Sequence, residues 1–177
     1  MDLEGRKKNL GPRVTSGITQ NAFVTLSPKN YRFHRPVLVA AGVDDDASGV
    51  ATKDVVLDAA TGLTVRLFLP KRREPSGKKL PVLVYFHGGG FLLESAKSAT
   101  YHNYLTSLAA AAGVLAVSVD YRLAPEHRRP AAYDDCWTAL QWAASARDDD
   151  WLAEHGDASR VFVAGDSAGG NIVHNVL

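Results

Sequence analysis

Ser167 is the side chain best placed for chemistry, because it stands at the centre of a G-x-S-x-G pattern that runs from Gly165 to Gly169. The apolar stretch 161–164 precedes the pattern and predicts a buried strand. A tight turn from strand to helix holds a serine hydroxyl clear of its own backbone. It requires Gly165 and Gly169, since a Cβ at either position would collide with the neighbouring strand and helix. Ser167 is therefore a candidate nucleophile. The alternative is an ordinary serine in a glycine-rich turn, because the pattern is short.

A second glycine-rich stretch, His87-Gly88-Gly89-Gly90, directly follows the apolar run Leu80 to Phe86, which also predicts a buried strand. Acyl transfer needs hydrogen-bond donors aimed at the carbonyl oxygen as it becomes an oxyanion, and glycine lets backbone amides approach a substrate. A flexible loop or a phosphate cradle is the alternative. A phosphate loop, however, would place a lysine and a serine or threonine where Phe91-Leu92-Leu93 stands.

The two motifs together define the predicted site. Ser167 is the nucleophile, and the oxyanion hole is built from Gly88, Gly89, Gly90 and Ala168, with the amides of Gly89, Gly90 and Ala168 as donors. Residues 168–177 lack proline and predict a helix, whose free N-terminal amides favour negative charge on an attacked carbonyl. The supporting residues of the two motifs are His87, Gly165, Asp166 and Gly169.

The chain resembles the hormone-sensitive-lipase-type branch of the α/β-hydrolases, and within it the plant carboxylesterases related to the gibberellin receptors. The matching stretches are 50–70, 80–91, 101–133 with its Tyr-Arg-Leu-Ala-Pro-Glu-His segment from Tyr121, and 157–175. The resemblance implies that His87 supports the geometry of the glycine loop. It also implies that an N-terminal segment, with 31–45 as the candidate, forms part of a cap over the pocket.

Strands alternate with helices along the rest of the chain. Residues 50–70 predict an antiparallel hairpin, 100–112 a helix stopped by Gly113, and 114–119 a further buried strand. Pro130 opens another helix, for which we expect a buried stripe of Tyr133, Trp137, Leu140 and Ala144. A polar connection, 154–159, leads into the strand before Ser167.

The predicted fold is therefore α/β: a mainly parallel, doubly wound sheet with an N-terminal antiparallel hairpin, truncated after the turn that presents Ser167. Residues 1–47 are expected to be an irregular arm, and 48–177 a partial α/β-hydrolase domain. The acidic run 44–46 is expected to be a solvated loop rather than a metal site, because no further spaced oxygen ligands follow it. Arg122 and Glu126 are expected to form an ion pair that supports the glycine loop.

Composition narrows the possible partners. The 177 residues are 46% hydrophobic and 22% charged with a net charge of +1, which gives no reason to expect binding to nucleic acid or to an acidic membrane surface. A single cysteine, Cys136, suits a reducing compartment, and no stretch is long and apolar enough to span a bilayer. We expect a cytoplasmic protein, with the nucleus as a second location, that acts on a small-molecule ester and needs no cofactor or metal. The sequence does not fix its oligomeric state.

A general base for Ser167 is missing from the predicted site. In this fold the triad acid and histidine follow the serine, yet no Asp or Glu does so here, and His174 stands about two helical turns, or roughly 10 Å, further along. The predicted function is carboxylic ester hydrolysis, with the 177-residue chain inactive and aggregation-prone by itself. A non-catalytic receptor for a gibberellin-type hormone is the alternative on the same fold. The third glycine, Gly90, favours the esterase, because the receptors carry serine there.

Overall fold

The structure is a computed structural model that describes residues 35–42, 48–71, 78–145 and 148–177. Residues 36–177 form one compact unit. The predictions for the N-terminal arm before residue 35 and for the acidic run 44–46 lie outside the described residues. In chain order the elements are β1 Val50–Asp58, β2 Leu63–Pro70, β3 Leu80–Phe86, α1 Ala99–Ala112, β4 Leu115–Asp120, α2 Ala131–Ser145, α3 Asp150–His155, β5 Gly156–Gly165 and α4 Ala168–Val176.

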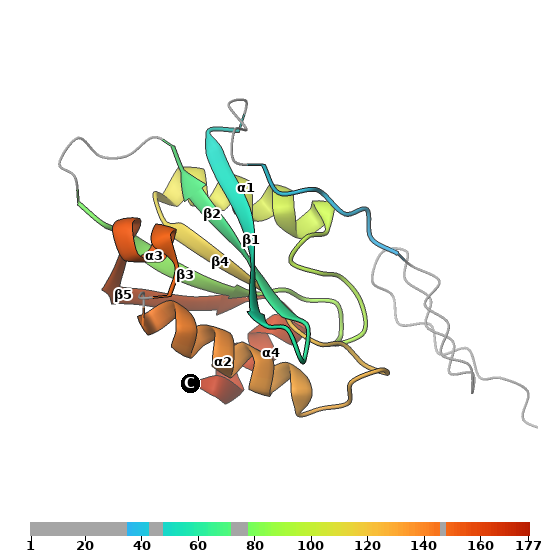
Figure 1. Cartoon of the computed structure of the whole chain (residues 1–177). Coiled ribbons are helices and arrows are strands. Elements are labelled where there is room, and N and C mark those ends of the chain that lie inside the picture. The colour runs from blue at the N-terminus through green and yellow to red at the C-terminus, as the bar shows by residue number, and fades with distance from the viewer. Residues whose placement is uncertain (1–34, 43–47, 72–77, 146–147) are drawn as a thin grey trace, which may run out of the picture. The chain divides into compact units, whose positions relative to one another are not determined.

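The five strands form a single mixed sheet in the order β1-β2-β4-β3-β5 (Figure 1). The predicted hairpin of β1 and β2 is antiparallel, and β2 also pairs antiparallel with β4. The half of the sheet that carries both glycine motifs is parallel, because β3 lies between β4 and β5 and runs in the same direction as both. The α/β prediction is confirmed, and the chain alternates strand and helix as that class requires.

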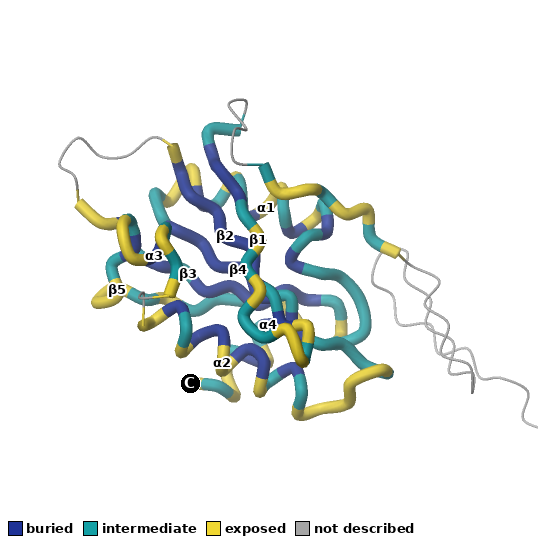
Figure 2. The backbone as a smooth tube through the Cα atoms, in the orientation of Figure 1, coloured by how far each residue is buried: buried dark blue, intermediate teal, exposed yellow. Residues whose placement is uncertain are grey.

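Helices cover both faces of the sheet. On one face α1 packs over a cluster that includes Phe68, Tyr85, Leu105 and Ala116. On the other face, α2 and α4 pack over a larger cluster. Its buried strand residues come from β2, β3 and β4, and Val84 is one of them. The central strands are accordingly buried along most of their length (Figure 2). Strands that are apolar on both faces require this double cover, which the continuous apolar runs predicted.

Helix α1 agrees closely with its prediction. It ends at Ala112, and Gly113 follows in the left-handed conformation with φ 62° and donates its N–H to the Ala109 carbonyl. This is the glycine stop expected of a helix C-terminus. Tyr101, Leu105 and Ala109 form the buried stripe.

The buried stripe of α2 differs from the prediction. Trp137 is 47% exposed and Ala144 is also exposed, whereas Ala132, Cys136 and Ala139 face the sheet together with Leu140. Small side chains allow the helix to approach the strands closely, so the helix turns its alanine and cysteine face inward and leaves the bulky tryptophan outside.

The connection before Ser167 also differs. Residues 150–155 form the short helix α3, and β5 begins at Gly156, where only 161–164 was predicted as strand. The signal for α3 was present in the sequence, because Asp149 accepts hydrogen bonds from the amides of Trp151 and Leu152 as an N-cap residue. The pairing of β5 with β3 shifts register between Pro81 and Val82, so residues 158–160 have no partner in β3.

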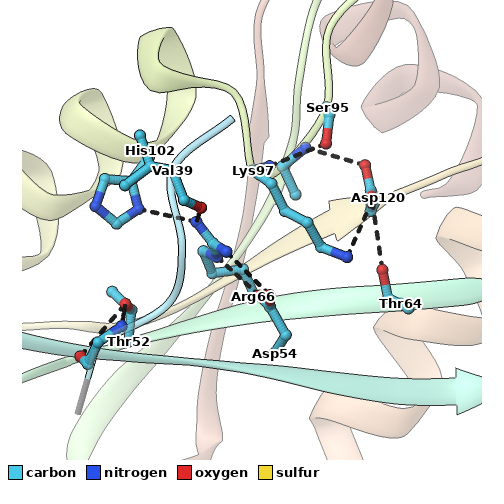
Figure 3. A network of polar contacts seen from close by, with 11 residues as sticks. Val39, Thr52, Asp54, Thr64, Arg66, Ser95, Lys97, His102 and Asp120 are labelled. Atoms are coloured by element: carbon cyan, nitrogen blue, oxygen red, sulfur yellow. Dashed lines mark hydrogen bonds and ion pairs between the residues drawn. The ribbon is translucent and has the colours of Figure 1, made fainter. Parts of the chain in front are cut away.

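Arg66 holds the segment 36–42 against the rest of the unit (Figure 3). Its side chain is fully buried and donates two hydrogen bonds to the carboxylate of Asp54, at 2.8 and 2.9 Å. Nη1 donates to the Val39 carbonyl at 2.8 Å and contacts Nδ1 of His102 at 3.1 Å. The segment 36–42 also forms backbone hydrogen bonds with residues 97 and 99. Together with the bond from Arg66, these contacts tie the segment to β2 and to the start of α1.

Candidate active site

Ser167 stands between β5 and α4 in a backbone conformation that few residues adopt. Its φ of 50° and ψ of −113° lie outside the strand and helix regions. The turn is closed by hydrogen bonds from the Gly169 amide to the Asp166 carbonyl and from the Asn171 amide to the Ser167 carbonyl. Ser167 is exposed, although Ala168 and Gly169 after it are buried. Such strain costs about 1–3 kcal/mol and is common where a side chain has to be presented for a function.

The two flanking glycines have the steric role that the sequence suggested. A Cβ on Gly165 would lie 2.6 Å from the backbone of Gly169 and 2.7 Å from the Phe86 carbonyl oxygen. A Cβ on Gly169 would meet the same Phe86 oxygen and, at 2.9 Å, the His87 oxygen. Strand β3 and helix α4 therefore touch through bare backbone at this point, and only glycine fits both positions.

The glycine loop lies at the same end of the sheet as Ser167. Phe86, the last residue of β3, pairs with Gly165, the last residue of β5, so the two turns leave parallel neighbouring strands side by side. Gly89 and Gly90 have φ values of 111° and 63°, and the Gly89 carbonyl accepts hydrogen bonds from the amides of Leu92 and Leu93. The ends of parallel strands are where ligands bind in α/β sheets.

The backbone amides divide into two groups. In the part of the chain that the structure describes, the amides of Gly89, Gly90 and Ala168 have no hydrogen-bond acceptor, whereas Gly88 donates to the Tyr101 hydroxyl at 2.7 Å and to Asp166 Oδ1 at 3.1 Å. The assignment of Gly88 to the oxyanion hole stays a prediction. Its N–H is already used inside the protein, and these two hydrogen bonds anchor the loop to α1 and to the turn after β5.

His87 is fully buried beneath the loop. Its Nδ1 lies 2.7 Å from the Gly88 carbonyl, which requires the proton on Nδ1, and its ring stacks on Tyr121 at 4.2 Å. Tyr121 also donates its hydroxyl to the His87 carbonyl at 2.6 Å. Burial lowers the pKa of the imidazole and keeps it neutral. These contacts are those of a residue that holds the loop in shape.

Asp166 collects donors from both sides of the site. Its Oδ1 accepts from the Tyr85 hydroxyl at 3.0 Å and its Oδ2 from the Tyr101 hydroxyl at 2.9 Å, in addition to the Gly88 amide. Burial and the nearby carboxylate raise the pKa of both phenols, which therefore stay protonated as donors. Sequence reasoning missed Tyr85 and Tyr101, because a tyrosine in an apolar strand or helix stripe gives no sign of where its hydroxyl points.

Arg122 has a different partner from the one predicted. Its guanidinium binds the buried carboxylate of Asp135 through Nε and Nη2, and its own backbone amide donates to Asp135 as well. These bonds raise the pKa of the Arg122 guanidinium above its ordinary value. The pair fixes the segment after Tyr121 to α2, so its support of the loop is indirect.

His174 lies in the last turn of α4, whereas Ser167 precedes the first turn. The helix rise separates them by roughly 10 Å, so the two side chains are not brought together. Among residues 35–42, 48–71, 78–145 and 148–177, no group of three His, Cys, Asp or Glu side chains could hold a metal ion. No helix within the same ranges is long and apolar enough to cross a membrane.

A strained serine between strand and helix, next to a glycine loop on the neighbouring parallel strand, is the arrangement of an α/β-hydrolase. Residues 83–177 match the family described as alpha/beta hydrolase fold, and the chain belongs to that family. Among curated proteins it is 59% identical over 131 residues to tuliposide A-converting enzyme 2, chloroplastic, of Tulipa gesneriana, covering 72% of this chain and 34% of the relative. It is 52% identical over 130 residues to probable carboxylesterase 3 of Arabidopsis thaliana, covering 72% of this chain and 41% of the relative.

Solved structures give the same result. A hyperthermophilic esterase from Pyrobaculum calidifontis superimposes with a TM-score of 0.58 at 39% identity, over 68% of this chain and 36% of the esterase. The thermostable carboxylesterase EstE1, cloned from a metagenomic library, gives 0.60 at 34% identity, over 78% and 42%. The chain thus spans 34% and 41% of the two curated relatives' lengths, and the stretch 83–177 that matches the family model carries both glycine motifs.

Proposed function

We propose that the full-length gene product is a serine carboxylic ester hydrolase. In this proposal Ser167 Oγ attacks the ester carbonyl carbon, and the amides of Gly89, Gly90 and Ala168 stabilise the oxyanion. The alcohol then leaves with a proton, and water hydrolyses the acyl-enzyme to the acid. The observation that carries the proposal is the pairing of Phe86 with Gly165, which sets the strained Ser167 beside amides that lack an acceptor among the described residues.

The proposal needs a general base that the described residues do not supply. His87 is buried with its proton on Nδ1 towards Gly88, and His174 lies at the far end of α4. We therefore place the triad acid and histidine in sequence outside these 177 residues, in keeping with the greater length of the relatives. The 177-residue chain by itself should then show no turnover above a Ser167→Ala control, because a serine hydroxyl without a base is a weak nucleophile.

The names of the relatives support the substrate class, since they include probable carboxylesterases and solved esterases. A small, uncharged ester is the proposed substrate. We also keep the cytoplasm as the proposed location, to be tested with a fluorescent fusion of the full-length gene product in plant cells. Import of the fusion into plastids would contradict it.

The test uses the full-length gene product with p-nitrophenyl acetate and a fluorophosphonate probe. The unchanged protein should release p-nitrophenol and be labelled by the probe, and Ser167→Ala should lose both. Ser159→Ala, at an exposed serine, is the matched control and should keep both. Turnover that survives Ser167→Ala would overturn the nucleophile assignment. Binding of a small hormone without turnover or labelling would support the receptor alternative.

A further inference from the structure

The hydroxyl of Tyr101 connects the two halves of the candidate site. It accepts a hydrogen bond from the Gly88 amide at 2.7 Å and donates its proton to Asp166 Oδ2 at 2.9 Å. Gly88 precedes the two residues whose amides are proposed to bind the oxyanion, and Asp166 precedes Ser167. A phenol has one proton to donate, so these two bonds define a single orientation of the hydroxyl.

We propose that Tyr101 is a positioning residue, which sets the distance between the Gly89 and Gly90 amides and the Ser167 hydroxyl by holding Gly88 against Asp166. This inference rests on the proposed function. Tyr101 does not touch the reacting atoms in the proposal, and it acts through its neighbours on either side of the site.

The loop, the carboxylate and the phenol are in direct contact. A Cβ on Gly88 would meet Asp166 Oδ2 and would lie 2.7 Å from the Tyr101 oxygen. Asp166 is an exposed residue, so hydrogen bonds rather than burial hold its carboxylate here. Because Gly88, Tyr101 and Asp166 are each hydrogen-bonded to the other two, a shift of any one of them strains the bonds of the others.

The phenol itself is fixed from outside the loop. Tyr101 is a buried residue of α1, and its ring packs against those of His87 at 5.4 Å and Tyr85 at 6.2 Å. Helix α1 covers the sheet from the face opposite to α2 and α4. The position of the glycine loop therefore depends on the core under α1 as well as on β3, the strand that precedes the loop.

The consequence for catalysis follows from the distances that oxyanion donors require. Donors act at about 2.7–3.1 Å from the oxyanion, and a misplacement of about 1 Å can cost on the order of 10²-fold in rate. Loss of the Tyr101 hydroxyl leaves the Gly88 amide with one acceptor in place of two and frees one oxygen of Asp166. The loop should then hold its amides less well in the transition state, with little change in ground-state binding.

The experiment compares Tyr101→Phe with Tyr104→Phe in the full-length gene product. Tyr104 lies on the same helix, is 49% exposed and also packs on the ring of Tyr85, so it is a matched control. Active sites are counted by fluorophosphonate titration, and kcat and KM for p-nitrophenyl acetate are given per titrated site. Tyr101→Phe should lower kcat by about 10- to 100-fold with KM within about threefold, and Tyr104→Phe should change neither.

A second measurement reads the oxyanion hole itself. An aryl trifluoromethyl ketone forms a tetrahedral adduct with the serine, and its affinity should fall in Tyr101→Phe by the factor lost in kcat/KM. An unchanged kcat per titrated site in Tyr101→Phe, or a loss confined to KM, would overturn the positioning role while leaving the proposed function intact. An unchanged protein with neither turnover nor labelling would overturn the proposed function and this inference with it.

Discussion

The Phe86 carbonyl oxygen occupies the space that a Cβ on Gly169 would need. Phe86 ends the strand that leads into the glycine loop, and Gly169 belongs to the first turn of the helix after Ser167. The two motifs, far apart in sequence, therefore depend on each other through a contact between bare backbones.

Gly169→Ala should destabilise the protein and disturb both turns. The methyl group would force β3 and α4 apart, and overpacking of this kind typically costs about 1–3 kcal/mol or more. Gly170→Ala is the matched control, because its Cβ would come no closer than 3.3 Å to the Gly165 oxygen and alanine favours a helix. Chemical denaturation should show a clear loss for Gly169→Ala and a change within about 1 kcal/mol for Gly170→Ala. Equal effects of the two variants would contradict this account.

Arg66→Met should loosen the segment 36–42 as well as destabilise the unit. Methionine keeps most of the buried stem and removes the hydrogen bonds to Asp54 and Val39. A broken buried ion pair costs about 3–5 kcal/mol, and we expect about 2–3 kcal/mol here because Asp54 is 34% exposed and can be hydrated. Faster hydrogen exchange of the Val39 and Ala99 amides should accompany the loss.

Arg160→Met is the control for that experiment. Its pairing with Asp157 is exposed, and exposed pairs contribute little. The control should leave the melting temperature and the exchange of Val39 nearly unchanged. A stable Arg66→Met variant with normal exchange at Val39 would show that the segment is held by its backbone bonds alone.

Cys136 should resist alkylation until the protein unfolds. Its thiol is buried in α2, and burial raises its pKa well above the ordinary value, so little thiolate is present. Iodoacetamide should react about 10²-fold or more slowly with the native than with the denatured protein. In Cys136→Ala combined with Thr138→Cys, the new thiol is on the exposed side of the same helix and should react rapidly in the native state. Equal native rates for the two thiols would contradict the burial of Cys136.

The sequence was sufficient to predict β1 to β4, α1 and both glycine turns, because their signals are local. Strand β5 was predicted only over 161–164 and as buried, whereas it begins at Gly156, forms an edge of the sheet and leaves Phe162 57% exposed. Buried parallel strands are continuous apolar runs, and the spacing of Gly165 and Gly169 reflects the contact with Phe86 directly. The buried face of α2 was harder to predict, because several of its buried positions carry small residues such as Ala132, Cys136 and Ala139, which give a weaker apolar signal than Trp137. The partner of Arg122 was also missed. Asp135 is distant from Arg122 in sequence, and only the packing of α2 brings its carboxylate to the guanidinium.

The sequence suggested which residues form the candidate site, but not the hydrogen bonds that connect them. In the sequence alone the amide of Gly88 looked equivalent to those of Gly89 and Gly90, because all three residues are glycines in one run. What separates them is the pair of acceptors that Tyr101 and Asp166 provide, and these come from α1 and from the turn after β5. Such long-range partners follow from the register of β3 with β5 and from the position of α1, neither of which a local pattern specifies.

Stability should fall on mild acidification because of His87. Burial lowers the pKa of its imidazole in the folded protein below the ordinary value of about 6.5, which it regains on unfolding. Below that pH the unfolded state binds the proton more readily than the folded state. The His87 contribution to the free energy of unfolding is therefore complete above about pH 6.5 and decreases as the pH falls, by up to about 1.4 kcal/mol per pH unit.

The measurement is the free energy of unfolding by denaturant between about pH 7.5 and 5.5, in the unchanged protein, in His87→Gln and in His174→Gln. His87→Gln should be less stable at every pH, since the stacking on Tyr121 is lost. Its free energy of unfolding should, however, depend less steeply on pH than that of the unchanged protein. His174→Gln, at an exposed histidine, should keep the slope of the unchanged protein. Asp157, whose pKa is lowered to about 2 by its bonds to Ser159 and Arg160, titrates well below this window and does not interfere. A slope that survives in His87→Gln would show that another group takes up the proton and that the imidazole beneath the glycine loop is not kept neutral by its burial.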